Sequence, residues 1–105
     1  MQEEYSDFRI SELMATLKAG HNNATKREDL ALKLDLSDRK VRSLIEKARE
    51  EGCLIMNNQD GRGYYLPASI EDIERQYWQD TNRALAIFKR RKHMRRLLKE
   101  AGLKV

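Results

Sequence analysis

The stretch that decides the fold is LALKLDLSDRKVRSLIEKA, residues 30–48. Apolar residues recur in it at helical spacing, first in a short run that ends at Leu34 and again in a longer run over residues 38–51. Asp35 between the runs favours a turn with left-handed backbone geometry, and Ser37 is a good N-cap for the second helix. The sequence therefore predicts two helices joined by a tight turn, with Leu36 filling the space between them. The predicted buried positions are Leu30, Ala31, Leu34, Val41, Leu44, Ile45 and Ala48.

Upstream of this stretch, the sequence predicts a first helix over residues 7–19. Its apolar stripe consists of Ile10, Leu13, Met14 and Leu17. Gly20 suits a left-handed cap at the end of this helix, and residues 20–23 then form a loop. Thr25 and Glu28 match a capping box, in which the Thr hydroxyl and the Glu carboxylate satisfy free backbone N–H groups at the start of the next helix.

Downstream, the spacing of apolar residues changes after Gly52. Two short β-compatible runs, residues 53–56 and 64–66, enclose the turn-forming residues 57–63, which predicts a β-hairpin that must pack on the helices to be stable. A long helix without Gly or Pro follows from Ile70 to Glu100. The expected fold class is mainly α (α+β). Three helices and a two-stranded hairpin form a first domain, residues 1–68, and a long basic helix occupies residues 69–105.

The second helix of the predicted pair presents cations to solvent. Its face opposite the buried stripe carries Arg39 and Ser43 in the N-terminal half, and Glu46 and Glu50 in the C-terminal half. Cations near a helix start oppose the helix dipole, which indicates a function beyond solvation. A helix that enters a DNA major groove by its N-terminal end would bring such side chains to bases and phosphates. The predicted DNA-binding residues of this helix are Ser37, Arg39, Lys40, Arg42, Ser43 and Lys47.

Charge is divided unevenly along the chain. Residues 1–82 hold 12 Lys/Arg and 16 Asp/Glu, a net charge of −4, whereas residues 83–105 hold nine Lys/Arg and one Glu, a net charge of +8. Segregated positive charge indicates a polyanionic partner. Three arrangements fit the C-terminal helix. It lies along the DNA backbone, it forms a parallel or antiparallel dimer seam with Tyr77, Leu85 and Phe88, or it orders only on a partner.

Among these arrangements, we expect a combination of the first two. The proximal part of the helix would form a homodimer, and its distal part would contact the DNA backbone. The predicted backbone-contacting residues are Lys89, Arg90 and Arg91.

Residues 30–42, LALKLDLSDRKVR, resemble the LA..L.vS..tV.R signature of winged helix-turn-helix DNA-binding domains, notably the biotin-repressor-like group. Ile45, Ala48, Gly52, Ile55 and the sequence GRGYYL at residues 61–66 are similar to that family's I..L...G..I....G.GY.L ending. The resemblance covers residues 7–66, and Asp35 departs from it where the family often has Gly.

The resemblance implies a protein that binds specific sequences in double-stranded DNA. Helix 38–51 would lie in the major groove, and the wing, residues 57–63, would contact the backbone or minor groove through Arg62. The chain also resembles small phage and prophage proteins that pair such a domain with a basic C-terminal helix. That likeness implies a regulator of transcription or replication.

Other functional classes have little support in the sequence. No run of 18 apolar residues indicates a transmembrane helix, and residues 1–11 are acidic and polar, unlike a secretory signal. Cys53 is the single cysteine, and His21 and His93 lack the spacing of metal ligands. We expect a cytoplasmic, non-enzymatic protein of a bacterial or phage-infected cell, without a cofactor, metal or small-molecule substrate. The alternative function is a winged protein–protein interaction module without DNA binding, which the net charge of −4 over residues 1–82 would favour.

Overall fold

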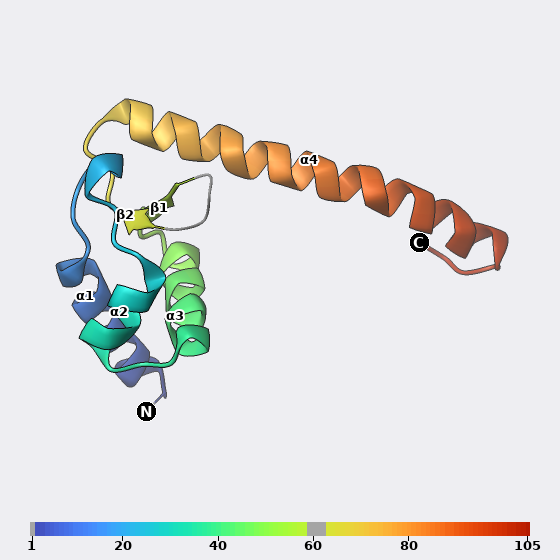
Figure 1. Ribbon diagram of the computed structural model, residues 1–105. Coiled ribbons are helices and arrows are strands. Elements are labelled where there is room, and N and C mark those ends of the chain that lie inside the picture. Colours follow the sequence, from blue (N-terminus) through green and yellow to red (C-terminus); the bar gives the residue numbers. More distant parts are fainter. Residues whose placement is uncertain (1, 59–62) are drawn as a thin grey trace. The chain divides into compact units, whose positions relative to one another are not determined.

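The computed structural model describes the backbone of residues 2–58 and 63–105, and the side chains within these ranges from Arg9 onward. The elements in chain order are α1 (Gln2–Thr16), the short 3₁₀ helix η1 (His21–Asn23), α2 (Arg27–Leu34), α3 (Asp38–Glu50), β1 (Met56–Asn57), β2 (Tyr64–Tyr65) and α4 (Ile70–Glu100) (Figure 1). The predicted class, mainly helical with a two-stranded antiparallel hairpin and a long C-terminal helix, is confirmed. The chain divides into two compact units, Met1–Glu74 and Arg75–Val105.

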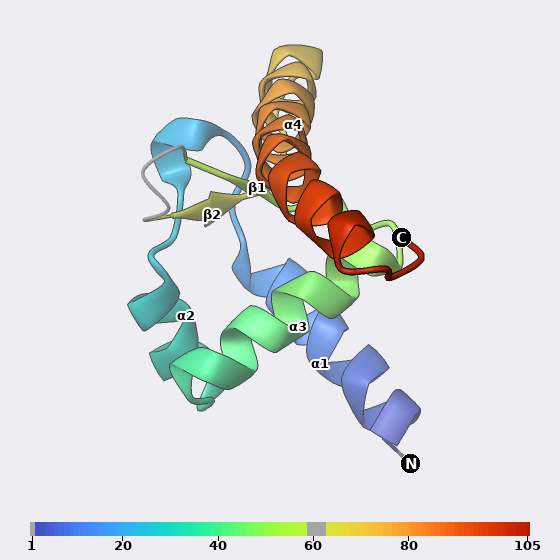
Figure 2. The ribbon, with the colours of Figure 1, turned by 90° about the vertical axis from the view of Figure 1, so that its right-hand side faces the viewer.

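The core of the first unit lies between three helices, with α3 packed against both α1 and α2 (Figure 2). Leu13 of α1, Leu30 of α2, and Val41 and Ala48 of α3 have no exposed surface. Leu34, Leu44 and Ile45 are also buried, whereas Ala31 and Leu36 are partly buried and pack against the same cluster. The predicted core is therefore confirmed, and one side of α3 is buried in it.

The connection between α2 and α3 follows the local sequence closely. Asp35 adopts left-handed geometry, with φ 53° and ψ 51°, and ends α2 at the predicted residue. The Leu36 N–H donates to the Ala31 carbonyl at 3.0 Å, which closes the turn. Ser37 is the N-cap of α3, because its Oγ accepts a hydrogen bond from the Lys40 N–H at 3.2 Å. The turn and the cap are both as predicted, and α3 ends at Glu50, one residue before the expected end.

The first helix differs from its prediction at both ends, since α1 begins at Gln2 and ends at Thr16. It ends early because the backbone after it pairs with the segment that follows β2. The Leu66 N–H donates to the Lys18 carbonyl, and the Gly20 N–H donates to the Leu66 carbonyl, both at 2.8 Å. Gly20 has φ 92° and ψ 141°, an extended conformation open only to glycine, and precedes η1. The prediction that Gly20 caps the first helix in left-handed geometry was therefore wrong.

The predicted capping box at Thr25 was also wrong. The Thr25 N–H donates to the Tyr64 carbonyl at 2.8 Å, and the Tyr64 N–H donates to the Thr25 carbonyl at 2.9 Å. Thr25 is thus paired with β2, and the N-cap of α2 is Lys26, whose side chain makes no capping hydrogen bond. The pairing brings the chain close to Gly63, where an added Cβ would lie 2.7 Å from the Cβ of Ala24.

The hairpin is shorter than predicted. Its strands hold two residues each, with Met56 opposite Tyr65 and Asn57 opposite Tyr64. Ile55 belongs to the same buried cluster as the helices, and Tyr64 and Leu66 pack against it, so the hairpin packs on the helical core as expected. Residues 59–62 of its turn, including the predicted wing residue Arg62, lie outside the described residues.

The long C-terminal helix is confirmed with the predicted bounds, Ile70–Glu100. At its start, Asp72 accepts a hydrogen bond from the Ala68 N–H at 2.9 Å. At its end, Gly102 has φ 88°, the Gly102 N–H donates to the Lys99 carbonyl, and the Leu103 N–H donates to the Leu98 carbonyl, each at 3.0 Å. This is a Schellman motif, which ends a helix by satisfying its last carbonyl groups.

Candidate nucleic-acid interface

The outer face of α3 carries most of the predicted site. Because Val41, Leu44, Ile45 and Ala48 are buried, the opposite side of the helix faces solvent. Arg39, Lys40, Arg42 and Ser43 are all exposed there, and Lys47 is partly exposed. The structure thus places these predicted residues together on the free side of one well-packed helix.

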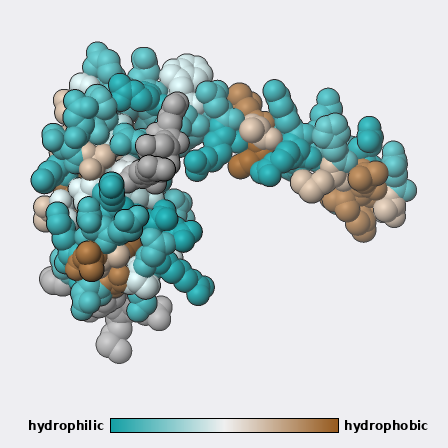
Figure 3. Space-filling model, in the orientation of Figure 1, coloured by the Kyte–Doolittle hydropathy of each residue, from teal (hydrophilic) through white to brown (hydrophobic). Residues whose placement is uncertain are grey.

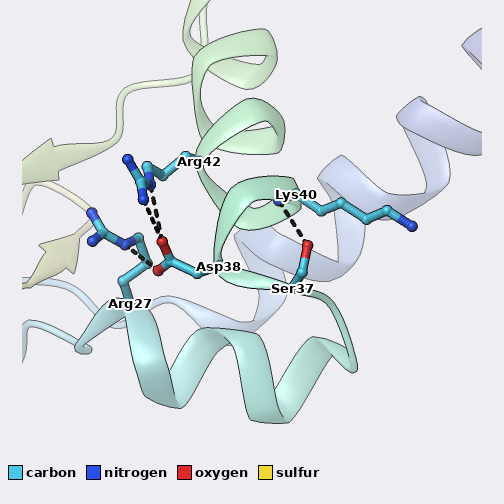
Figure 4. A network of polar contacts seen from close by, with 5 residues as sticks. All are labelled: Arg27, Ser37, Asp38, Lys40 and Arg42. Carbon is cyan, nitrogen blue, oxygen red and sulfur yellow. Dashed lines mark hydrogen bonds and ion pairs between the residues drawn. The ribbon is translucent and has the colours of Figure 1, made fainter.

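Two arginines from different helices converge on Asp38, the first residue of α3 (Figure 4). The Arg27 Nε of α2 donates to Asp38 Oδ1 at 2.5 Å. On the other side of the carboxylate, Arg42 Nε and Nη2 both donate to Asp38 Oδ2, at 3.0 and 2.7 Å. We call these three residues the Arg27–Asp38–Arg42 cluster, which carries a net charge of +1.

The cluster shifts the titration of its members. Hydrogen bonds from Arg42, and then from Arg27, lower the pKa of the Asp38 carboxyl, because each stabilises the charged form. Conversely, the hydrogen bond to Asp38, with a further contribution from Tyr64, raises the pKa of Arg27. Arg42 keeps 61% of its side chain exposed, so its guanidinium is oriented by Asp38 and still open to solvent.

The sequence pattern did not single out Arg27. Its contact with Asp38 crosses from one helix to the next and depends on how the turn at Asp35 sets them. The Asp38–Arg42 pair could have been predicted from the sequence, since residues four apart on a helix are neighbours. Asp38 therefore screens the charge of Arg42. The cationic face expected from the sequence had no such acidic partner.

Arg39 and Lys40 differ from Arg42 in this respect. Both side chains are exposed, and neither has an ion pair with any other residue that the structure describes. Only the backbone N–H of Lys40 is engaged, by Ser37. Because Ser37 Oγ accepts this bond, its hydroxyl proton remains available to a further acceptor. The start of α3 thus offers two unpaired cations and one hydroxyl.

The C-terminal half of α3 is tied to the hairpin by Arg49, another residue that the pattern did not single out. Arg49 Nε donates to the Ile55 carbonyl, and its Nη2 donates to Asn57 Oδ1, both at 3.0 Å. The guanidinium also lies 5.9 Å from the ring centre of Tyr64, within cation–π range. Arg49 therefore holds the base of the hairpin against the end of α3. These contacts join separate elements, so the sequence pattern does not predict them.

The outer face of this half is mixed in charge. Glu46 and Glu50 are exposed, and together with Arg42, Ser43 and Lys47 they line a shallow, open depression. Neither a buried acid nor an apolar floor is present among these lining residues, so the depression lacks the features of a small-molecule site.

The remaining predicted residues are not on α3. Lys89, Arg90 and Arg91 are exposed on the part of α4 that belongs to the second unit. The guanidinium of Arg91 lies 5.5 Å from the ring centre of Phe88. Within the described ranges, no group of three or more His, Cys, Asp or Glu could hold a metal ion. Nor is any described helix both long and apolar enough to cross a membrane.

Comparison with known proteins returned no matching family model, no matching curated protein and no matching solved structure.

Proposed function

We propose that this protein is a winged helix-turn-helix protein that binds specific sequences in double-stranded DNA, with α3 in the major groove. The observation that carries the proposal is the pair Arg39 and Lys40, exposed and unpaired at the start of a helix whose other side is buried. Recognition helices contact bases by this end, and an arginine there can bond guanine O6 and N7 bidentately.

Each residue of the face then has a distinct role. Arg39 and Ser43 contact base edges, and Lys40 and Lys47 contact phosphates. Arg42 lies on the same face, but two hydrogen bonds hold it to Asp38, whose carboxylate balances its charge, so it does not contribute a full cation to the wild-type complex. The wing, residues 57–63, contacts the DNA backbone or minor groove through Arg62. A partner chain completes a homodimer through α4, whose Lys89 and Arg90 contact the flanking backbone. The class of protein that fits is a phage or prophage regulator of transcription or replication.

The fixed geometry of α3 supports this function. A recognition helix must be rigid, because a small displacement of its side chains breaks bidentate contacts with bases. The helix is packed on α1 and α2, its start is joined to α2 through Asp38 and Arg27, and its end is joined to the hairpin through Arg49. Its exposed side chains therefore project from a backbone held at both ends.

The test is selection of bound duplexes from a random pool, followed by titration of the selected duplex by fluorescence anisotropy. Arg39→Ala is expected to cost about 1–3 kcal/mol and to relax the preference at one base position. Lys18→Ala, an equal loss of charge at an exposed residue outside the proposed face, is the matched control. Affinity for the wild type should fall steeply with salt, as counterion release requires. If no sequence is enriched, or if Arg39→Ala binds like Lys18→Ala, the proposal fails.

A protein–protein interaction module is the second candidate, and one observation favours it. Leu32 of α2 is 81% exposed and offers a large aliphatic side chain for contact with a partner protein. Such a module would give no retardation of duplex DNA at low salt. Leu32→Ser would then abolish a protein complex, whereas under the DNA-binding proposal it leaves affinity for the duplex unchanged.

A further inference from the structure

Along α4, a run of positions follows the alternating three- and four-residue spacing of a coiled-coil seam. Within the second unit these seam positions are Tyr77, Asp80, Ala84, Ile87, Arg91 and Met94. The same spacing continues along the helix to Ile73 on one side and Leu98 on the other. The apolar seam residues are exposed in the single chain, with Tyr77 at 61%, Ile87 at 47% and Met94 at 56%. Figure 3 shows hydrophobic side chains gathered in two groups along this helix, separated by hydrophilic ones.

The seam has an internal symmetry about the point between Leu85 and Ala86. Reflection through that point exchanges Ala84 with Ile87, Asp80 with Arg91, and Tyr77 with Met94. A two-fold dimer with antiparallel helices centred there would place these residues opposite each other, since residue i contacts j and j contacts i in such an interface. The next pair outward would be Ile73 with Leu98. Every seam position would thereby meet another seam position.

The two charged positions decide the direction of pairing. In an antiparallel dimer, Asp80 of each chain meets Arg91 of the other, and both charged layers hold complementary pairs. In a parallel dimer, Asp80 would face Asp80 and Arg91 would face Arg91, and each like-charge contact in a seam is strongly unfavourable. A few charged positions in a seam are an established means of fixing register and orientation.

Asp80 and Arg91 are both available for these contacts. Gln76 Nε2 donates to Asp80 Oδ1 at 3.0 Å, which orients the carboxylate and leaves Oδ2 without a partner among the described residues. Arg91 has no ion pair in the described part of the chain and lies over Phe88. Each side chain is therefore exposed, oriented by a neighbour on its own helix, and lacking its counter-ion.

Charged residues on the two edges of the seam would also approach each other between the chains. Antiparallel pairing would bring Glu74 near Arg95 of the other chain on one edge, a further complementary pair. On the other edge, Arg83 would approach Arg90, an exposed like-charge pair whose repulsion solvent and salt screen. Phe88 and Leu97 flank the seam and would widen its apolar contact.

We propose that the partner of α4 is a second copy of this chain, paired antiparallel about the point between Leu85 and Ala86, with two Asp80–Arg91 ion pairs setting the register. This specifies the homodimer included in the proposed function, but it rests on α4 and needs no DNA. It also assigns Arg91 to the seam, so that Lys89 and Arg90 remain for contact with phosphates.

The test is charge reversal in the full chain, measured by sedimentation equilibrium without DNA. Asp80→Arg and Arg91→Asp each convert both ion pairs into like-charge pairs, and each is expected to weaken dimerisation by about 100-fold or more. The double variant restores both pairs with reversed polarity and is expected to return to within about tenfold of the wild type. Arg96→Asp, the same chemical change at a position outside the seam, is the matched control and should dimerise normally. Circular dichroism confirms that each variant keeps α4 helical.

Orientation is read independently by disulfide formation in a Cys53→Ser background. A mixture of Tyr77→Cys and Met94→Cys chains should cross-link into heterodimers, whereas Tyr77→Cys alone should not cross-link. A monomeric wild type, unaffected single reversals, or cross-linked Tyr77→Cys would each overturn the pairing. A chain that dimerises as described yet binds no DNA would contradict the proposed function alone, so the two failures are distinguishable.

Discussion

Replacing Asp38 with Asn changes the charge on the face of α3 at a single side chain. The carboxylate now holds Arg27 at 2.5 Å and Arg42 at 2.7 Å. Asn keeps the size of the side chain and one accepting oxygen, but it replaces the other oxygen with an NH2 donor and removes the negative charge. The cluster then changes from a net charge of +1 to +2, and Arg42 is released toward solvent from the N-terminal end of the proposed recognition helix.

The size of the effect follows from counterion release. One additional cation at a phosphate steepens the dependence of log affinity on log salt by about 0.9, which corresponds to about tenfold tighter binding near 0.1 M salt. The gain should apply equally to specific and random duplexes, because phosphates carry no sequence information. Asp38→Asn is therefore expected to bind both duplexes more tightly than the wild type, with the ratio of the two affinities unchanged.

The assay is fluorescence anisotropy on a selected and a random duplex across a series of salt concentrations. Asp29→Asn is the matched control, since Asp29 is an exposed carboxylate of α2 without an ion pair among the residues described. Urea unfolding of both variants verifies that they remain folded. The reasoning is refuted if Asp38→Asn shows the affinity and salt slope of Asp29→Asn, because Arg42 would then have no part in contacting phosphates.

Three further predictions concern stability. Leu30→Ala removes a side chain with no exposed surface, and urea unfolding should show a loss of about 2–5 kcal/mol, whereas Leu32→Ala should cost far less. Gly63→Ala places a Cβ 2.7 Å from that of Ala24, and thermal unfolding should reveal a loss of about 1–3 kcal/mol. The pKa of Asp38 is lowered in the folded state, so its contribution to stability is present above its ordinary pKa and lost as pH falls through the lowered value. Asp38→Asn should therefore lose less stability than the wild type as the pH falls from neutral to below the ordinary pKa of an aspartate, measured by urea unfolding at each pH.

Helices α2 and α3 could be predicted from the sequence because the signals that begin and end them are local. Ser37 caps α3 and Asp35 ends α2 through interactions with residues three or four positions away. Thr25 shows the limit of such reasoning. Its sequence context equally suits a capping box, but β2 takes its backbone into a pairing with Tyr64, and this contact depends on the folded position of the hairpin.

The residues of the candidate site likewise include some that local sequence predicts and others that depend on the folded structure. Periodicity alone placed Arg39, Lys40 and Ser43 on the free side of α3, because the buried stripe fixes the opposite face. The partners that hold this helix in place, Arg27 and Arg49, lie across tertiary contacts with Asp38 and the hairpin. No spacing in the sequence reports such contacts, since the residues involved belong to different elements.

The acidic balance of residues 1–82 does not by itself oppose contact between α3 and DNA. Exposed charges more than about 8 Å apart are largely screened at physiological salt. At a rise of about 1.5 Å per residue, Arg39 and Glu50 are separated by about 16 Å along the axis of α3. A phosphate near Arg39 and Lys40 would therefore experience a cationic surface, whereas near Glu46 and Glu50 it would meet Lys47 beside two carboxylates. This distribution of charge along α3 favours entry into the groove by the N-terminal end of the helix over an approach with the helix axis parallel to the groove. The net charge of the chain plays no part in this preference.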